Sequence, residues 1–254
     1  MNNLSGKTIL LTGSSKGIGC ATAELLGREG AYLIAHYGSD QEGAIAATRD
    51  IADDHKILIH ADFNEPSATR DLWKQALAWR GTIDVLVANA AIMPEAAFSD
   101  EDELWEKAWY SALQVNTTAP AFLIREAVNH FLLNGGGSIV GISSWAAQRG
   151  AGNMKLGAYS ASKAGIAALV KTIARAYGKN GIYAYLIAPG VVRTGMSIAS
   201  AMSTGGEEKI TSTLAMGEWV PPNDIAEMVA FLCTGAHKQL SGATFDVNGA
   251  SYIR

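Results

Sequence analysis

Tyr159 and Lys163 are the residues of this chain whose types and spacing most directly suggest acid–base chemistry. Side chains four residues apart lie on the same face of a helix. One positive charge about 4 Å from a phenol supplies on the order of 4 kcal/mol at an effective dielectric near 20. Lowering a tyrosine pKa from about 10 to ~7 needs roughly that much. The pair can therefore exchange a proton near neutral pH, if the rest of the chain supplies a reaction; the alternative is a tyrosine packed beside a solvated lysine.

The composition describes a globular chain with a sizeable core. Hydrophobic residues make up 48% and charged residues 17%, which suits one α/β domain over residues 1–254. The net charge of −4, without a basic run, argues against nucleic acid or a membrane as a partner. The two cysteines, Cys20 and Cys233, form no disulfide framework. With no apolar signal segment at the N-terminus, the sequence predicts a reduced, cytoplasmic protein.

Strand-like and helix-like segments alternate along the chain. We expect strands at 8–12, 32–37, 56–61, 83–88, 138–142, 182–188 and 243–247. We expect helices at 17–29, 41–53, 68–79, 158–179 and 224–233, and a long helical stretch at 101–133 interrupted near Asn116. This order predicts an α/β, single-domain, Rossmann-like doubly wound sheet, mainly parallel, with about seven strands and helices on both faces. Its site would lie at the carboxyl ends of the strands.

A glycine-rich turn joins the first expected strand to the first expected helix. Residues 12–19 read Thr-Gly-Ser-Ser-Lys-Gly-Ile-Gly, which places glycines at 13, 17 and 19. Glycines let a backbone turn tightly and approach a pyrophosphate, whose charge is met by free N–H groups at the helix N-terminus. An ordinary glycine-rich connection is the alternative, but its place directly after the first strand favours a dinucleotide site.

Further motifs follow in a fixed order. They are Asp62 after the third strand, Asn89-Ala90-Ala91 after the fourth, Asn116 in the long helix, Ser143-Ser144 after the fifth, Tyr159 with Lys163, and Pro-Gly-Val-Val-Arg-Thr at 189–194. Together with the glycine turn, this set resembles the single-domain short-chain dehydrogenase/reductase family over nearly the whole chain. Ala91 replaces the glycine of the family's N-A-G, and Asn248 departs from a common V-D-G-G.

The resemblance implies hydride transfer between a nicotinamide cofactor and a carbonyl or alcohol. Tyr159 would be the general acid or base, and Lys163 would lower its pKa and hold the nicotinamide ribose. Ser144, rather than Ser143, would stabilise the substrate oxygen. Asn116 would kink its helix and bind a proton-relaying water, or simply bond to backbone. The implied cofactor contacts are Gly13, Ser15, Lys16, Gly17, Ile18, Gly19, Tyr37, Ser39, Asp62, Phe63, Asn89, Ala90, Tyr159, Lys163, Pro189, Gly190, Val192 and Thr194.

The choice of nicotinamide cofactor depends on charge near the second strand. A free 2′-hydroxyl is usually held by an acidic residue there, and a 2′-phosphate needs a cation. The family's acidic position falls at Tyr37, which cannot serve, whereas Lys16 precedes Gly17. His36 and Ser39 could add hydrogen bonds, so NADP(H) is favoured over NAD(H). A shifted loop that brought Asp40 to the ribose would favour NAD(H) instead.

The substrate is the least determined part of the prediction. Ser144 precedes Tyr159 by 15 residues, two more than in many members of the family, and we expect the intervening 145–158 loop to shape the pocket. The stretch 195–222, with paired glycines and paired prolines, is predicted to be a substrate lid. No Lys or Arg occurs at 130–137, which favours a small-molecule substrate over a 3-oxoacyl-carrier-protein.

Three further expectations complete the prediction. A nucleotide-sensing protein of the same fold without turnover is the alternative from another class. The five histidines show no metal-ligand spacing, so no metal site is expected. Trp105 and Trp109 lie four apart on the long helix, and analogy with the family favours a homotetramer or homodimer.

Overall fold

Seven strands form one sheet in the computed structural model, which describes residues 3–254. The strands are β1 (Thr8–Thr12), β2 (Tyr32–Tyr37), β3 (Lys56–His60), β4 (Val85–Ala88), β5 (Gly137–Ile142), β6 (Ile182–Pro189) and β7 (Thr244–Val247). They lie in the order β3-β2-β1-β4-β5-β6-β7, and each neighbouring pair is parallel. This confirms the predicted doubly wound sheet. The order reverses between β1 and β4, the point at which such sheets bind ligands.

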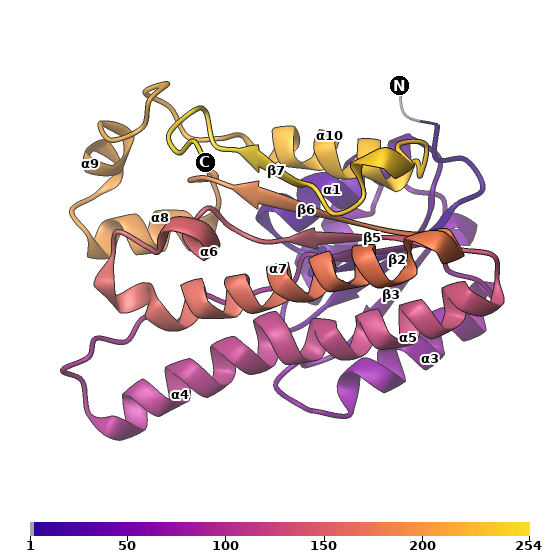
Figure 1. The fold of residues 1–254 in the computed structure, drawn as a ribbon, viewed down its shortest axis with the longest axis horizontal. Helices are drawn as coiled ribbons and strands as arrows, with labels where there is room; N and C mark the ends of the chain where they lie inside the picture. Colours follow the sequence, from indigo (N-terminus) through magenta and orange to yellow (C-terminus); the bar gives the residue numbers. More distant parts are fainter. Residues whose placement is uncertain (1–2) are drawn as a thin grey trace.

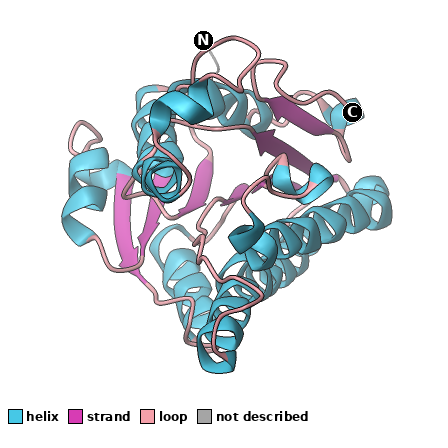
Figure 2. Ribbon diagram, turned by 90° about the vertical axis from the view of Figure 1, so that its left-hand side faces the viewer, coloured by secondary structure: helices cyan, strands magenta, loops and turns pink. Residues whose placement is uncertain are grey.

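Helices cover both faces of this sheet. They are α1 (Gly17–Arg28), α2 (Gln41–Ala47), α3 (Ala68–Arg80), α4 (Asp102–Leu113), α5 (Ala119–Leu133), α6 (Ala146–Arg149), α7 (Gly157–Tyr177), α8 (Gly195–Ser203), α9 (Glu207–Thr211) and α10 (Pro222–Cys233). Figure 1 shows α1 and α10 above the sheet and α5 and α7 below it. The sheet also lies between these two layers in the end-on view of Figure 2.

The strand β1 shows how the sequence pattern builds the core. Ile9 and Leu11 belong to a buried cluster with residues of α1 and α10, whereas Leu10 belongs to a second cluster with residues of α3, α5 and α7. Successive side chains of a strand point to opposite faces. A strand covered on both faces is therefore apolar without alternation, and all five residues of β1 are buried. This packing fixes the end of β1 from which the glycine turn starts.

The second helix is shorter than the sequence pattern predicts. We expected it over 41–53, but α2 ends at Ala47. The Lys56 ammonium donates hydrogen bonds to the carbonyl oxygens of Thr48 and Ile51 at 3.0 and 2.8 Å. A basic side chain satisfies carbonyls that a helix end leaves free. The stop is thus provided by a residue of the following strand, which local periodicity does not reveal.

Two stretches expected to be loops contain helices. The segment 195–222 holds α8 and α9, separated by Gly205 and Gly206, both with positive φ. The segment 145–158 holds α6 and a 3-10 turn at Met154–Leu156. The α8–α9 segment leaves and rejoins the body at one point, because Val192 and Val220 form an isolated parallel bridge. It is therefore a folded flap with a narrow base.

Candidate active site

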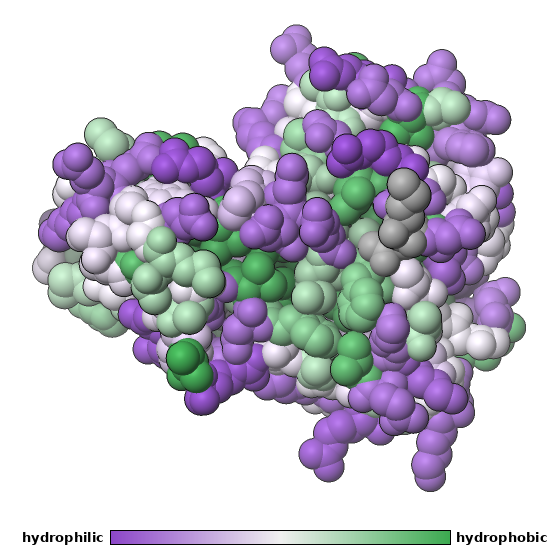
Figure 3. Space-filling model, turned by 90° about the horizontal axis from the view of Figure 1, so that it is seen from above, coloured by the Kyte–Doolittle hydropathy of each residue, from purple (hydrophilic) through white to green (hydrophobic). Residues whose placement is uncertain are grey.

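A cavity of about 780 Å³ opens beyond the carboxyl ends of the central strands. Figure 3, which views the molecule from above, shows a hollow between the α8–α9 lobe and the body, with apolar residues in it. Of the predicted cofactor contacts, all except Tyr37 line the cavity. Tyr37 instead packs its ring against His60, with ring centroids 5.5 Å apart. The predicted catalytic residues Ser144, Tyr159 and Lys163 also line it, whereas Asn116 does not.

The glycine turn, residues 12–19, has a backbone path that requires glycine at several positions. Gly13 and Gly17 have φ of 71° and 53°, in the left-handed region that favours glycine. A Cβ on Gly13 would lie 2.9 Å from the Ala90 Cα, and one on Gly19 would overlap the Gly13 carbonyl oxygen. The first turn of α1 holds no acidic residue, and its N-cap residue makes no capping hydrogen bond through its side chain. The open, positive end of α1 therefore fits the phosphates of a dinucleotide.

Asn89 fastens this turn to the end of β4. Its side-chain amide donates hydrogen bonds to the carbonyl oxygens of Thr12 and Gly13 at 2.9 and 3.0 Å. The Thr12 hydroxyl oxygen accepts from the backbone N–H groups of Asn89 and Ala90, each at 3.0 Å. These bonds join the two strand ends at the switch point, so the floor of the cavity is held in one conformation.

Tyr159 and Ser144 place two hydroxyl groups on the same cavity wall. Tyr159 lies in the first turn of α7 and Ser144 directly after β5. Burial raises the pKa of the Tyr159 phenol above its ordinary value, and a hydrogen bond with the Ser144 side chain acts in the opposite direction. The adjacent Ser143 turns its hydroxyl away and donates to the Lys163 carbonyl at 3.1 Å. Ser144 is therefore the serine that can share a ligand oxygen with Tyr159.

Lys163 lies beneath Tyr159 with its ammonium buried. Its Nζ is 6.0 Å from the centre of the Tyr159 ring and donates to the Ile142 carbonyl oxygen at 2.8 Å. Burial lowers the pKa of the Lys163 ammonium from 10.5 to about 8. Burial thus acts on the pKa of both groups, raising that of the Tyr159 phenol and lowering that of the Lys163 ammonium. The expectation that Lys163 lowers the Tyr159 pKa stays a prediction.

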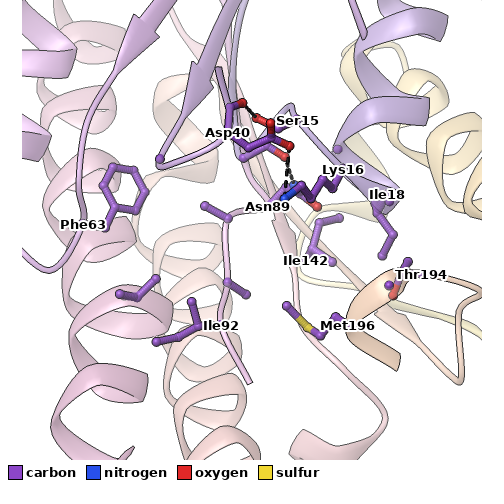
Figure 4. A pocket seen from close by; sticks show the side chains of 18 of the residues that line it. Ser15, Lys16, Ile18, Asp40, Phe63, Asn89, Ile92, Ile142, Thr194 and Met196 are labelled. Atoms are coloured by element: carbon purple, nitrogen blue, oxygen red, sulfur yellow. Dashed lines mark hydrogen bonds and ion pairs between the residues drawn. The ribbon is translucent and has the colours of Figure 1, made fainter. Parts of the chain in front are cut away.

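Lys16 and Asp40 form an ion pair at the far end of the cavity. Their charged atoms are 3.1 Å apart, and the Lys16 side chain is 78% exposed. Asp40 also caps α2, since its carboxylate accepts from the Gly43 N–H at 3.0 Å. This cap, followed by Lys16, holds the pKa of Asp40 below its usual value. Figure 4 shows both residues beside Ser15, whose hydroxyl donates to the Asp40 carbonyl.

This chain is similar to known proteins over nearly its whole length. The family model described as enoyl-(acyl carrier protein) reductase matches residues 13–250. The 3beta-hydroxysteroid dehydrogenase 1 of Eggerthella lenta is 32% identical over 257 residues, which cover 98% of this chain and 94% of that protein. The chain belongs to the short-chain dehydrogenase/reductase family.

Other members of the family carry different names. Cis-4-hydroxycyclohexanecarboxylate dehydrogenase of Sinomonas cyclohexanicum is 32% identical over 96% of this chain and 95% of its own length. A crystal structure of 3-ketoacyl-(acyl-carrier-protein) reductase from Brucella melitensis, complexed with NADH, has a TM-score of 0.86 and 27% identity, covering 98% of this chain and all of that one. The chain is therefore an oxidoreductase of a family that acts on carbonyl and alcohol groups.

Asn116 interrupts the long helix in this family member as the sequence predicts. It lies in a π-helical turn at Gln114–Thr118, between α4 and α5. Its side chain pairs with both backbone groups of Ile92 at 2.8 Å and donates to the Ser162 hydroxyl at 3.0 Å. The side chain thus joins the segment after β4 to α7, three residues after Tyr159. These contacts show the expected bonding to backbone; the proton-relaying role, which is compatible with them, stays a prediction.

His36 has a structural position rather than the phosphate-binding one we considered. It is 2% exposed. Its Nδ1 accepts from the Gly13 N–H at 3.0 Å, and its Nε2 lies 2.9 Å from the Ala61 carbonyl oxygen. Burial lowers its pKa to about 4, so the ring is neutral and Nε2 carries the hydrogen. It also stacks on Phe63, with centroids 4.3 Å apart, and so holds the cavity wall.

Several lining residues escaped the sequence prediction. They are His36, Gly38, Asp40, His60, Ala61, Asn64, Ala91, Ile92, Val115, Ile142, Ser143, Gly195, Met196 and Ser197, of which Ser143, His36 and Asp40 had been considered in other roles. Ile92 and Met196 follow predicted motifs within two residues, which is the signal that could have found them.

Within residues 3–254, no group of three or more His, Cys, Asp or Glu side chains could hold a metal ion. No helix in that range is long and apolar enough to span a bilayer.

Proposed function

We propose that this protein is an NADP(H)-dependent oxidoreductase that interconverts a carbonyl and a secondary alcohol on a small-molecule substrate. The observation that carries the proposal is the common cavity: the hydroxyl groups of Tyr159 and Ser144 share one wall of the space that the glycine turn opens. A phosphate-binding end and a proton-donating end in one cavity suit hydride transfer coupled to proton transfer.

Each catalytic side chain has a separate task in this proposal. Tyr159 gives its proton to the carbonyl oxygen in reduction and takes it from the alcohol in oxidation. Ser144 donates a hydrogen bond to the same oxygen as negative charge develops there. Lys163 holds the cofactor ribose and supplies positive charge beneath the tyrosine. The hydride that reaches the carbonyl carbon comes from reduced nicotinamide, which is oxidised by two electrons.

The preference for NADP(H) rests on Lys16. An exposed ion pair contributes little to stability, so Lys16 can leave Asp40 for a 2′-phosphate. Asp40 would stay engaged, because its carboxylate caps α2. The glycine turn, Asn89 and residues 189–194 would hold the remainder of the cofactor, and Asp62 and Phe63 would lie beside its adenine.

Replacing Lys16 tests the cofactor assignment directly. We expect Lys16→Ala to raise the KM for NADPH about tenfold or more, because a charge-assisted hydrogen bond contributes about 1.5–3 kcal/mol, and to change the KM for NADH much less. Lys179→Ala, a surface lysine outside the cavity, is the matched control. Equal changes in the two KM values for Lys16→Ala would refute the preference for NADP(H).

A panel of carbonyl compounds and alcohols, followed by NADPH absorbance, tests the reaction itself. We expect turnover by the wild type, and a loss of about 10²–10⁴-fold in Tyr159→Phe, the usual contribution of a general acid. NADPH binding, measured by fluorescence titration, should be retained in the variant. Binding of NADPH without turnover across the panel would instead support a nucleotide-sensing protein.

Among alternative substrates, a 3-oxoacyl-carrier-protein is favoured by one specific observation. A 3-oxoacyl-[acyl-carrier-protein] reductase of Rickettsia conorii is 31% identical to this chain over 98% of both proteins. The segment 130–137 still offers no Lys or Arg for an acidic carrier protein, which supports the small molecule. Turnover of an acyl-carrier-protein thioester faster than of small ketones would reverse this order.

The flap and the assembly complete the proposal. Residues 195–222 would close over the substrate, since they form a folded unit on the narrow Val192–Val220 base.

A homotetramer or homodimer is supported by the family and by the partly exposed Trp105–Trp109 pair on α4, whose rings lie 5.1 Å apart. Light scattering in solution measures the assembly.

A further inference from the structure

The two ends of the cavity differ in chemical character. Lys16, Asp40 and Asp62 place charges at the adenine end. Figure 4 shows Ile92 and Met196 in the lower part of the cavity, away from the ion pair. Among the described lining residues near Tyr159 and Ser144, the charged side chain is Lys163. Its ammonium is buried and already bonded to a backbone carbonyl.

The acidic side chain nearest this rim is occupied by the protein itself. Glu95, in the segment after β4, accepts hydrogen bonds from Ser200 and Ser203 of α8, each at 3.0 Å. It also accepts from the Asn153 side chain at 3.2 Å. These bonds join the segments that follow β4, β5 and β6. The Glu95 carboxylate is therefore engaged in holding the rim together and is not left free for a cationic substrate.

Two polar side chains on the neighbouring 145–158 segment, Gln148 and Arg149, are likewise turned to other partners. The Gln148 amide donates to Asp246. The Arg149 guanidinium stacks over the Trp145 ring, 4.7 Å from its centre, and lies 5.9 Å from the centre of the Tyr252 ring. A charged substrate group would thus find the side chains of Glu95, Gln148 and Arg149 already engaged with protein partners. Burying an unpaired charge is strongly unfavourable.

Large apolar side chains are exposed around the same rim. Phe98 follows β4, Met154 follows β5, and Met196 and Met202 lie on α8. Their exposed fractions are 71%, 70%, 41% and 69%. Exposed apolar groups gathered on several segments mark a ligand-binding surface, and methionine adapts its shape to an apolar ligand. The rim therefore favours a partner with an apolar body.

We propose that the substrate is an uncharged, predominantly apolar ketone or secondary alcohol, whose body lies between Ile92 and Met196 while α8 covers it. The proposal rests on the proposed function, since it places the reacting oxygen at Tyr159 and Ser144. It deepens that function by excluding carboxylates, ammonium compounds and polyols as preferred substrates. Closure of the flap would bury Met196 against the substrate.

A set of ketones that differ only in one substituent tests the class. The probes are 4-methylcyclohexanone, 4-hydroxycyclohexanone, 4-oxocyclohexanecarboxylate and 4-(trimethylammonio)cyclohexanone. With NADPH at pH 7, we expect kcat/KM for the methyl compound to exceed that of each of the others by about tenfold or more, as for small differences in an apolar pocket. A charged or hydroxylated probe that is turned over as well as the methyl compound overturns the proposal.

Binding measured without turnover separates this proposal from the proposed function. The Tyr159→Phe protein loaded with NADPH is mixed with each probe and followed by saturation-transfer NMR. Selective binding of the methyl compound supports the apolar site, even if the wild type reduces no ketone and the proposed function fails. Equal binding of all four probes, or binding of none, overturns the apolar site.

Substitution of Met196 tests the surface that carries the argument. We expect Met196→Ser to raise the KM for 4-methylcyclohexanone about tenfold, because an apolar contact is lost. Met196→Leu, which keeps an apolar side chain, should stay within about twofold of the wild type on the same grounds. Leu133→Ser, an exposed apolar residue at the end of α5 and outside the cavity lining, is the control. An unchanged KM in a folded Met196→Ser protein that binds NADPH contradicts the assignment.

Discussion

The buried ammonium of Lys163 predicts that removing it stabilises the fold while destroying the site. Lys163 is 3% exposed, and burial lowers its pKa from 10.5 to about 8. Each pKa unit corresponds to about 1.4 kcal/mol, so keeping the ammonium charged in the folded protein costs about 3 kcal/mol. Loss of its hydrogen bond to Ile142 offsets about 1 kcal/mol. We therefore expect Lys163→Met to raise the free energy of unfolding by about 2 kcal/mol at pH 7, and to abolish turnover.

The pH dependence identifies the cause of this gain. Between pH 8 and 10.5 the unfolded wild type holds the Lys163 proton and the folded wild type does not, so wild-type stability rises with pH in that window. The variant lacks this contribution. Its advantage of about 2 kcal/mol at pH 7 should become a disadvantage of about 1 kcal/mol above pH 10.5, where only the lost hydrogen bond remains.

Urea unfolding at matched protein concentration, from pH 7 to pH 10.5, measures the difference between the two proteins. Other titrating groups, including Tyr159, are common to both and largely cancel in that difference. Equal concentration is needed because association shifts apparent stability. A stability difference that stays constant across this pH range would falsify the assignment of a buried, strained ammonium. A variant less stable at pH 7 would show that the hydrogen bond outweighs burial.

Two further predictions concern the cofactor turn and the flap. Gly19→Ala should weaken NADPH binding more than tenfold, a loss of at least about 1.4 kcal/mol, because the new Cβ overlaps the Gly13 carbonyl and displaces the turn that would hold the phosphates. Fluorescence titration measures the affinity. The control Gly178→Ala, whose Cβ meets open space, should bind NADPH normally. Similar NADPH affinity in Gly19→Ala and Gly178→Ala would contradict a role of the glycine turn in holding the phosphates. Glu95→Ala should speed amide hydrogen exchange across α8 several-fold and raise the KM of the carbonyl substrate with cofactor affinity unchanged, since each lost hydrogen bond is worth about 1 kcal/mol. Glu95→Gln, whose amide oxygen still accepts hydrogen bonds, should restore slow exchange. Unchanged exchange in Glu95→Ala would rule out that the Glu95 hydrogen bonds hold α8 in place.

The sheet and the glycine turn could be predicted because their signals are local. An apolar run such as Thr8–Thr12, followed at once by glycines, has few structural solutions, and repetition of the strand–helix unit fixes a parallel sheet. The cavity lining near the strand ends follows from the same rule. For these parts the short-range pattern and the global fold agree, which is why sequence reasoning succeeds there.

The parts that sequence reasoning missed depend on contacts between distant residues. Lys56, in the next strand, bonds to the Thr48 carbonyl at the end of α2. The ring of His36 bonds to Gly13, 23 residues away, and to Ala61. Glu95 meets Ser200 across 105 residues. A polar residue in a loop carries no local sign of which partner it will find, so such roles emerge only when the fold brings the segments together.

The electrostatics of Tyr159 give the two reaction directions different requirements. Burial raises its pKa, and Lys163 directs its ammonium to Ile142. A tyrosine in this state keeps its proton at pH 7, which is the form that protonates a carbonyl oxygen. Oxidation of an alcohol needs the phenolate and therefore additional positive charge near the ring. In the proposed reaction, oxidised nicotinamide would supply such a charge and reduced nicotinamide would not, so a bound oxidised cofactor would act with Lys163 in the direction that requires a base. Under this proposal the acid–base balance of the site would depend on the cofactor as well as on Tyr159 and Lys163.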